Sequence, residues 1–164
     1  MLPRMDGHQD IFIRDGRAFN MTAMVHKDRE LESWARYSDL AKRPPLSEFQ
    51  GVTFHHCNWL AGTLASLETM ADDLAADVPI GSQLLVADNL SALWLFGDFA
   101  PLQGGAPWYY GSQTGFENAD YVVIPKCALV ARVRGIIIDD LNASGARFAL
   151  VRDTEVLALF KVER

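Results

Sequence analysis

The last third of the chain, residues 119–164, constrains the fold most strongly. Residues 121–124 form a short apolar run rich in β-branched side chains, typical of a strand that is covered on both faces, and Pro125 ends the run. Apolar residues then recur at three- and four-residue spacing, which predicts a helix over residues 127–143. Gly145 follows where a helix commonly ends in a left-handed residue. We therefore expect a buried strand followed directly by an amphipathic helix.

Three further strands complete the predicted sheet. Residues 148–151 follow the helix, and a strand in that position returns parallel to the first one. The turn-prone tetrapeptide at 152–155 leads to another apolar run at 156–160, which predicts a C-terminal β-hairpin. Residues 82–87 form a second buried strand earlier in the chain. We therefore predict an α/β fold: a Rossmann-like, three-layer, mainly parallel sheet with helices on both faces and a C-terminal β-hairpin.

The length of 164 residues fits a single α/β domain that spans residues 1–164. Two consecutive prolines, Pro44 and Pro45, mark the end of a helical pattern near the N-terminus. The expected parts are, in order, a loosely ordered segment at 1–20, an N-terminal helix at 22–42, a short strand at 52–54, and a sheet core at 58–163 that begins with a helix at 58–76.

The composition is that of an ordinary globular protein, with 49% apolar and 22% charged residues. A net charge of -6 argues against a nucleic-acid partner, because binding to phosphates depends on clustered Lys and Arg. The chain has no apolar stretch of about 20 residues and no signal-peptide apolar region, so we expect no membrane span in it. Two localisations stay open: extracytoplasmic (periplasmic) if the chain is a soluble piece attached to or docked on a membrane protein, and cytoplasmic if it is full length.

Polar and aromatic residues follow the two buried strands. Asp88 and Asn89 come directly after the strand at 82–87, and Lys126 follows the strand that ends at Pro125. If these strands are parallel neighbours, their carboxyl ends meet at one edge, where ligands gather in open α/β sheets. The long irregular stretch at 98–118, a candidate binding or lid loop, carries aromatic rings suited to stacking on a sugar. The expected ligand is a sugar or sugar phosphate, and the expected ligand-binding residues are Asp88, Asn89, Trp108, Tyr109, Tyr110 and Lys126.

A purely structural interpretation of the same residues is also open. In it, Asp88 and Asn89 form a turn and a cap, with Asn89 starting a short helix over residues 90–96, and the aromatic rings plug the end of the sheet. Two acidic pairs, Asp72-Asp73 and Asp139-Asp140, are expected on solvated helix faces.

Histidine and cysteine residues offer weaker candidates. His55, His56 and Cys57 are of the types that bind zinc, but adjacent ligands rarely complete a tetrahedron and their possible partners have no diagnostic spacing. We therefore expect no metal site and no cofactor. Cys57 and Cys127 are expected to be two buried or half-buried thiols, with a single disulfide as the alternative.

The order of elements and two local phrases resemble a known family. The phrases are PIGSQLLVAD at 79–88 and ADYVVIPK at 119–126, which fit the patterns PxGSxLLVxD and ADYVVxPK. Over about residues 58–163 the chain resembles the soluble extracytoplasmic domain that follows the membrane helices in bacterial polytopic glycosyltransferases of the GT-C type. The resemblance implies an accessory domain with a Rossmann-like sheet that helps to shape an acceptor or sugar-lipid site, while the catalytic acid lies in loops of the membrane part.

These observations lead to one expected function and two alternatives. We expect a non-catalytic accessory or ligand-binding domain associated with cell-envelope glycosyl transfer. The first alternative is a small stand-alone α/β enzyme that uses Asp88 and Lys126 together with Cys127 or His56, although the chain has no GxSxG, HExxH or P-loop motif. The second alternative is a purely structural module that binds a protein partner.

Overall fold

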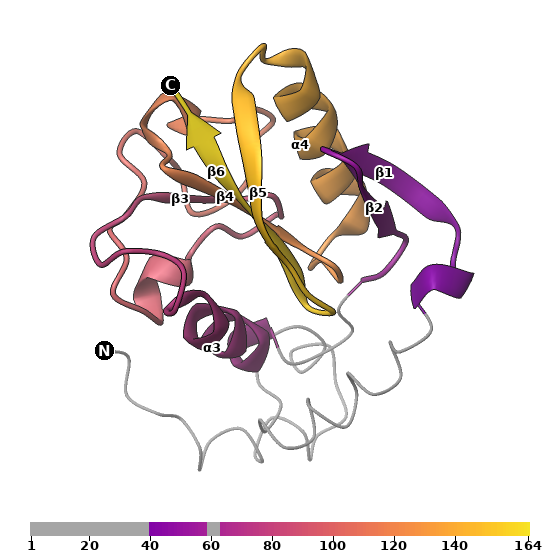
Figure 1. Ribbon diagram of the computed structural model, residues 1–164, viewed down its shortest axis with the longest axis horizontal. Helices are drawn as coiled ribbons and strands as arrows, with labels where there is room; N and C mark the ends of the chain where they lie inside the picture. The colour runs from indigo at the N-terminus through magenta and orange to yellow at the C-terminus, as the bar shows by residue number, and fades with distance from the viewer. Residues whose placement is uncertain (1–39, 59–62) are drawn as a thin grey trace.

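The computed structural model describes residues 40–58 and 63–164 (Figure 1). Its strands are β1 (Pro45–Phe49), β2 (Val52–His55), β3 (Leu84–Val86), β4 (Tyr121–Pro125), β5 (Arg147–Asp153) and β6 (Leu157–Glu163). Its α-helices are α3 (Thr63–Leu74) and α4 (Ala131–Ala143), and its short 3-10 helices are η2 (Leu40–Lys42), η3 (Leu93–Leu95) and η4 (Phe116–Asn118).

The main sheet has four strands in the order β3-β4-β6-β5. β3 and β4 are parallel neighbours, with Leu84 beside Tyr121 and Val86 beside Val123, so the predicted pairing of the two buried strands is confirmed. The prediction of a mainly parallel sheet is wrong, because β6 is antiparallel to both β4 and β5. β5 does run in the same direction as β4, as expected after a crossover helix. The C-terminal hairpin then inserts β6 between them, which makes the sheet mixed.

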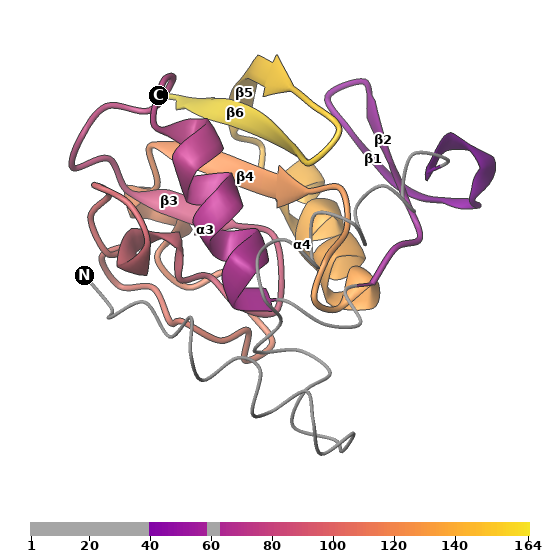
Figure 2. The ribbon, with the colours of Figure 1, turned by 90° about the horizontal axis from the view of Figure 1, so that it is seen from below.

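The two helices cover opposite faces of this sheet because side chains alternate along each strand. One face presents Leu84, Val86, Tyr121, Val123, Leu157 and Leu159 to the α3 side chains Leu67, Met70, Ala71 and Leu74. The other face presents Leu85, Ala87, Val122, Ile124, Ala158 and Phe160 to the α4 side chains Ile137, Ile138 and Leu141. Figures 1 and 2 show the strands lying between the two helices.

A two-stranded hairpin, β1–β2, packs beside α4 and extends the core on that side. Gln50 and Gly51 form its two-residue turn, and both have positive φ, as a type I′ turn requires. The sequence indicated only β2. β1 begins at a proline and is mostly exposed, so it lacks the alternation of apolar and polar residues that marks a strand. Gly135 of α4 allows the close approach of β1, since a Cβ there would lie 3.2 Å from the Ser47 hydroxyl. Phe49 reaches the core, with its ring centroid 4.8 Å from that of Phe160.

Several predicted helices differ from the observed ones or lie outside the described residues. The predicted loosely ordered segment at 1–20 lies outside the described residues. So does the predicted helix at 22–42, except for residues 40–42, which form η2. The helix predicted at 58–76 is described as α3, and Asn58 forms a parallel bridge with Ala128 instead of starting that helix. Asn89 does not cap a helix over 90–96: only η3 forms there, and no side chain caps it.

Two further observations concern the surface of the described part. Asp72, Asp139 and Asp140 are exposed, as expected, while Asp73 is half-buried and pairs at 2.8 Å with Arg152 on β5, which also binds Asp77 at 2.7 Å. No helix among residues 40–58 and 63–164 is both long and apolar enough to cross a membrane.

Candidate functional site

The irregular stretch at 98–118 lies along the outer edge of β3. At the start of β3, Ala100 forms a parallel bridge with Gln83. At its carboxyl end, Trp108 forms an antiparallel bridge with Leu90, and the Tyr109 N–H donates a hydrogen bond of 2.9 Å to the Asn89 carbonyl. The loop is therefore held beside both ends of β3, and its aromatic residues lie at the carboxyl end of the strand, where the predicted site lies.

The base of this loop is fixed to the sheet. The Gln103 N–H donates to the Gln83 side chain at 2.7 Å, and the Asn118 side chain donates to the Gln103 carbonyl at 2.9 Å. Gly115 has a φ of 83°, and a Cβ at that position would lie 2.5 Å from the Gly105 nitrogen. Only glycine fits this crossing of two backbone segments. The loop is thus attached at both ends and at its base, which favours the binding-loop interpretation over a hinged lid.

The three aromatic residues of the loop have different environments. Tyr109 is half-buried and packs against the core beneath α4, so the plug interpretation holds for this residue. Trp108 and Tyr110 are exposed, at 45% and 77% of their surface. Their rings therefore stand at the carboxyl end of β3 on a backbone that is hydrogen-bonded to residues 89 and 91.

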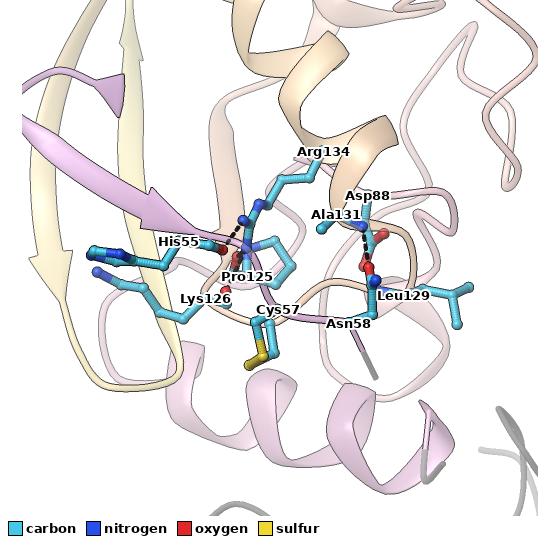
Figure 3. Close-up of a disulfide and its surroundings, with 10 residues drawn as sticks. His55, Cys57, Asn58, Asp88, Pro125, Lys126, Leu129, Ala131 and Arg134 are labelled. Carbon is cyan, nitrogen blue, oxygen red and sulfur yellow. Dashed lines mark hydrogen bonds between the residues drawn. A yellow bond between two sulfur atoms is a disulfide. The ribbon is translucent and has the colours of Figure 1, made fainter. Parts of the chain in front are cut away.

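Asp88 is buried at the end of β3 and acts as an acceptor for backbone N–H groups (Figure 3). One carboxylate oxygen accepts from Leu129 at 2.6 Å, and the other accepts from Asn89 at 2.7 Å and Val130 at 3.1 Å. Val130 is the N-cap residue of α4, so the carboxylate lies at the positive end of that helix. Burial raises the pKa of Asp88 to about 6, against the effect of these hydrogen bonds and of the Arg134 charge, which favour the ionised form.

A disulfide and a second side chain hold the same helix end. Cys57 and Cys127 are bonded with their Cα atoms 4.7 Å apart, so the prediction of two thiols is wrong and the alternative of a single disulfide is confirmed. The next residue, Asn58, accepts a hydrogen bond of 2.6 Å from the Ala131 N–H through its side-chain oxygen. The segment after β2 is therefore tied to the start of α4 both covalently and by a helix cap.

Arg134 is a fully buried charged residue that the sequence analysis did not single out. Its side chain is 0% exposed and donates to the backbone carbonyls of Pro125, Lys126 and His55 (Figure 3). The guanidinium carbon lies 5.5 Å from the centroid of the Phe54 ring. Burial lowers the pKa of Arg134 to about 10, which leaves it protonated at neutral pH. Its five donors suit a junction where three carbonyls converge.

The helical pattern of α4 contains a signal for this burial. The buried residues Ala131, Arg134, Gly135, Ile138 and Leu141 recur at three- and four-residue spacing, as regularly as the apolar residues that suggested the helix. Ile136 of the same helix is 39% exposed, so an apolar residue type does not by itself mark the buried face.

Lys126 does not join Asp88 as the predicted site requires. Its ammonium forms an ion pair of 2.5 Å with Asp153 at the end of β5 and lies 5.3 Å from the centroid of the Phe54 ring. Figure 3 shows Lys126 and Asp88 on opposite sides of the disulfide. The structure therefore brings Asp88, Asn89 and the aromatic loop together and leaves Lys126 with the β5–β6 hairpin.

The histidines of the predicted trio also have separate environments. The His55 ring is hydrogen-bonded through Nδ1 to the Arg43 carbonyl at 2.8 Å, and His56 is exposed. Within the described ranges, 40–58 and 63–164, no group of three His, Cys, Asp or Glu side chains is placed to hold a metal ion.

Comparisons of the chain with known protein families, with curated proteins and with solved structures find no match. The function proposed below therefore depends on the geometry of this site.

Proposed function

We propose that this chain is a non-catalytic accessory domain associated with cell-envelope glycosyl transfer, which binds a sugar- or phosphate-bearing ligand at the carboxyl end of β3. The observation that carries the proposal is the exposure of Trp108 and Tyr110 on a loop whose backbone is hydrogen-bonded to Asn89 and Ser91. Exposed aromatic faces stack on the apolar faces of sugar rings. A backbone that is already ordered also reduces the entropy lost on binding.

The contacts of the candidate catalytic groups favour binding over catalysis. Each oxygen of Asp88 accepts backbone N–H groups, and Lys126 is paired with Asp153. A general acid or base must reach the proton that it transfers, and these groups are instead directed at the protein itself. Cys57 and Cys127 share a disulfide, so neither supplies the thiolate that a cysteine nucleophile needs.

The disulfide also bears on localisation. Disulfides persist in oxidising compartments and are rare in the cytosol. Of the two expected localisations, the bond between Cys57 and Cys127 supports the extracytoplasmic one. The parallel β3–β4 pair with a helix on each face supports the proposed Rossmann-like relationship to the GT-C accessory domains.

A ligand titration of the purified domain tests this function. We would titrate the chain with neutral monosaccharides and with sugar phosphates, and compare wild type with Trp108→Ala and Tyr110→Ala by calorimetry. Ile80→Ala is a matched control, because Ile80 is 85% exposed but precedes β3 at its amino end. We expect wild type and Ile80→Ala to bind alike and the two aromatic variants to bind about tenfold more weakly. Equal binding by all four proteins would contradict the assignment of the loop as the site.

A further inference from the structure

The segment of the sequence that contains the aromatic loop carries no Lys or Arg. Residues 44–125 contain neither Lys nor Arg, and this segment includes β3, the whole loop at 98–118 and the strand that follows it. The same segment contains acidic residues, among them Asp88 at the carboxyl end of β3. Recognition of a phosphate group in proteins depends on Lys, Arg or unoccupied backbone N–H groups. The loop itself therefore offers a phosphate no positive charge.

The helix end beside the loop does not replace the missing cations. A helix N-terminus commonly binds an anion through its first N–H groups. In this chain the N–H groups of Leu129 and Val130 bind the Asp88 carboxylate, and the N–H of Ala131 binds Asn58. Asp88 is therefore already the anion at the start of α4, and a phosphate placed there would meet a like charge.

The described basic side chains of the main sheet are paired or lie away from the carboxyl end of β3. Lys126 is paired with Asp153, and Arg152 with Asp73 and Asp77. Lys161 lies opposite Tyr121 at the amino end of β4, away from the carboxyl end where the aromatic rings stand. Arg132 is exposed in the first turn of α4, next to the Asp88 cap, and is the described cation on which a phosphate at this site would depend.

We infer that the site formed by Trp108, Tyr110 and the carboxyl end of β3 takes an uncharged saccharide and discriminates against its phosphorylated form. This inference rests on the function proposed above and narrows its ligand class. The rings supply stacking that needs no charge on the ligand, whereas a phosphate gains no cation from the loop and is repelled by Asp88.

The test compares matched probes at pH 7. Glucose, galactose, mannose and N-acetylglucosamine are titrated into the chain by NMR, followed by the 1-phosphate of each sugar, at low and high salt. We expect at least one neutral sugar to bind and its 1-phosphate to bind at least about tenfold more weakly. The affinity for the neutral sugar should be the same in Arg132→Ala and at high salt.

The outcomes separate the two proposals. Binding of a 1-phosphate as tightly as its neutral sugar, lost in Arg132→Ala or at high salt, would overturn this inference and leave the ligand-binding function standing. Competition by inorganic phosphate for the neutral sugar would overturn it in the same way. Absence of binding by every neutral and phosphorylated probe would overturn the proposed function and this inference with it.

Discussion

The carboxylate of Asp88 accepts a 2.6 Å hydrogen bond from the backbone N–H of Leu129. This contact joins the end of β3 to the start of α4, two segments that are 41 residues apart in the chain. Asp88 therefore acts as a tertiary helix cap, and the exposed groups at this sheet edge that could meet the proposed ligand are the rings of Trp108 and Tyr110.

Replacement of Asp88 by Ala should destabilise the fold. The N–H groups of Asn89, Leu129 and Val130 would lose their acceptor, at a net cost of about 1–3 kcal/mol in the free energy of unfolding. Urea denaturation at pH 7 measures it. Asp98→Ala is the control, because this exposed acid should matter by less than about 0.5 kcal/mol. Equal stability of the two variants would show that Asp88 is not a structural cap.

The stability contributed by Asp88 should depend on pH. Burial raises its pKa to about 6 from 3.8, so between these values the folded chain holds more protons than the unfolded chain. The free energy of unfolding therefore falls as pH rises through this window, by about 3 kcal/mol relative to Asp88→Asn, which does not titrate. Denaturation of both proteins at pH 4 and pH 7 checks the sign. A difference that grows in favour of wild type with rising pH would mean that the N–H bonds outweigh burial.

Arg134 should be essential to the junction of β2, β4 and α4. Arg134→Met would leave the carbonyls of Pro125, Lys126 and His55 without their donor, and we expect a loss of about 3 kcal/mol or more. Arg134→Lys keeps the charge but not the planar fork of donors, so its free energy of unfolding should lie between those of wild type and Arg134→Met. The matched control is Arg132→Met, an exposed residue on the same helix. Similar unfolding midpoints for the two Met variants would contradict the buried arrangement.

The disulfide should stabilise the domain and should be present in the purified protein. Cys57 and Cys127 are 70 residues apart, and closing a loop of this length stabilises by about 4 kcal/mol in the chain-entropy description. We expect reduction, or the double change to Ser, to cost about 2–4 kcal/mol in urea denaturation. Mass spectrometry after thiol labelling gives an independent reading: two labelled cysteines in unreduced, unfolded protein would rule the bond out.

Both β3 and β4 are continuous apolar runs, which is typical of strands covered on both faces. Two such strands fit neighbouring positions in one sheet, so their adjacency could be predicted. The hairpin was visible in the turn-prone residues before Leu157. The insertion of β6 beside β4 could not be predicted, since strand order depends on long-range pairing, such as Val123 with Leu159, that leaves no local pattern.

The positions of the candidate site residues could be predicted only in part, for similar reasons. Asp88 and Trp108 could be placed at one sheet edge from the strand ends that precede or follow them. The direction of the Lys126 side chain could not be predicted, because it is set by an ion pair with Asp153, a residue on a different strand. The gap in Lys and Arg over residues 44–125 was present in the sequence throughout, but its meaning depends on knowing that this segment forms the rim of the site.

The most direct test of the account is an NMR titration of the isotopically labelled domain with neutral sugars, read residue by residue. We expect chemical-shift changes concentrated at residues 89–91 and 107–110, including the Trp108 indole N–H, and a loss of these changes in Trp108→Ala but not in Ile80→Ala. Shifts that avoid this loop, or none at saturating sugar, would contradict the claim that the aromatic loop at the carboxyl end of β3 is a carbohydrate site.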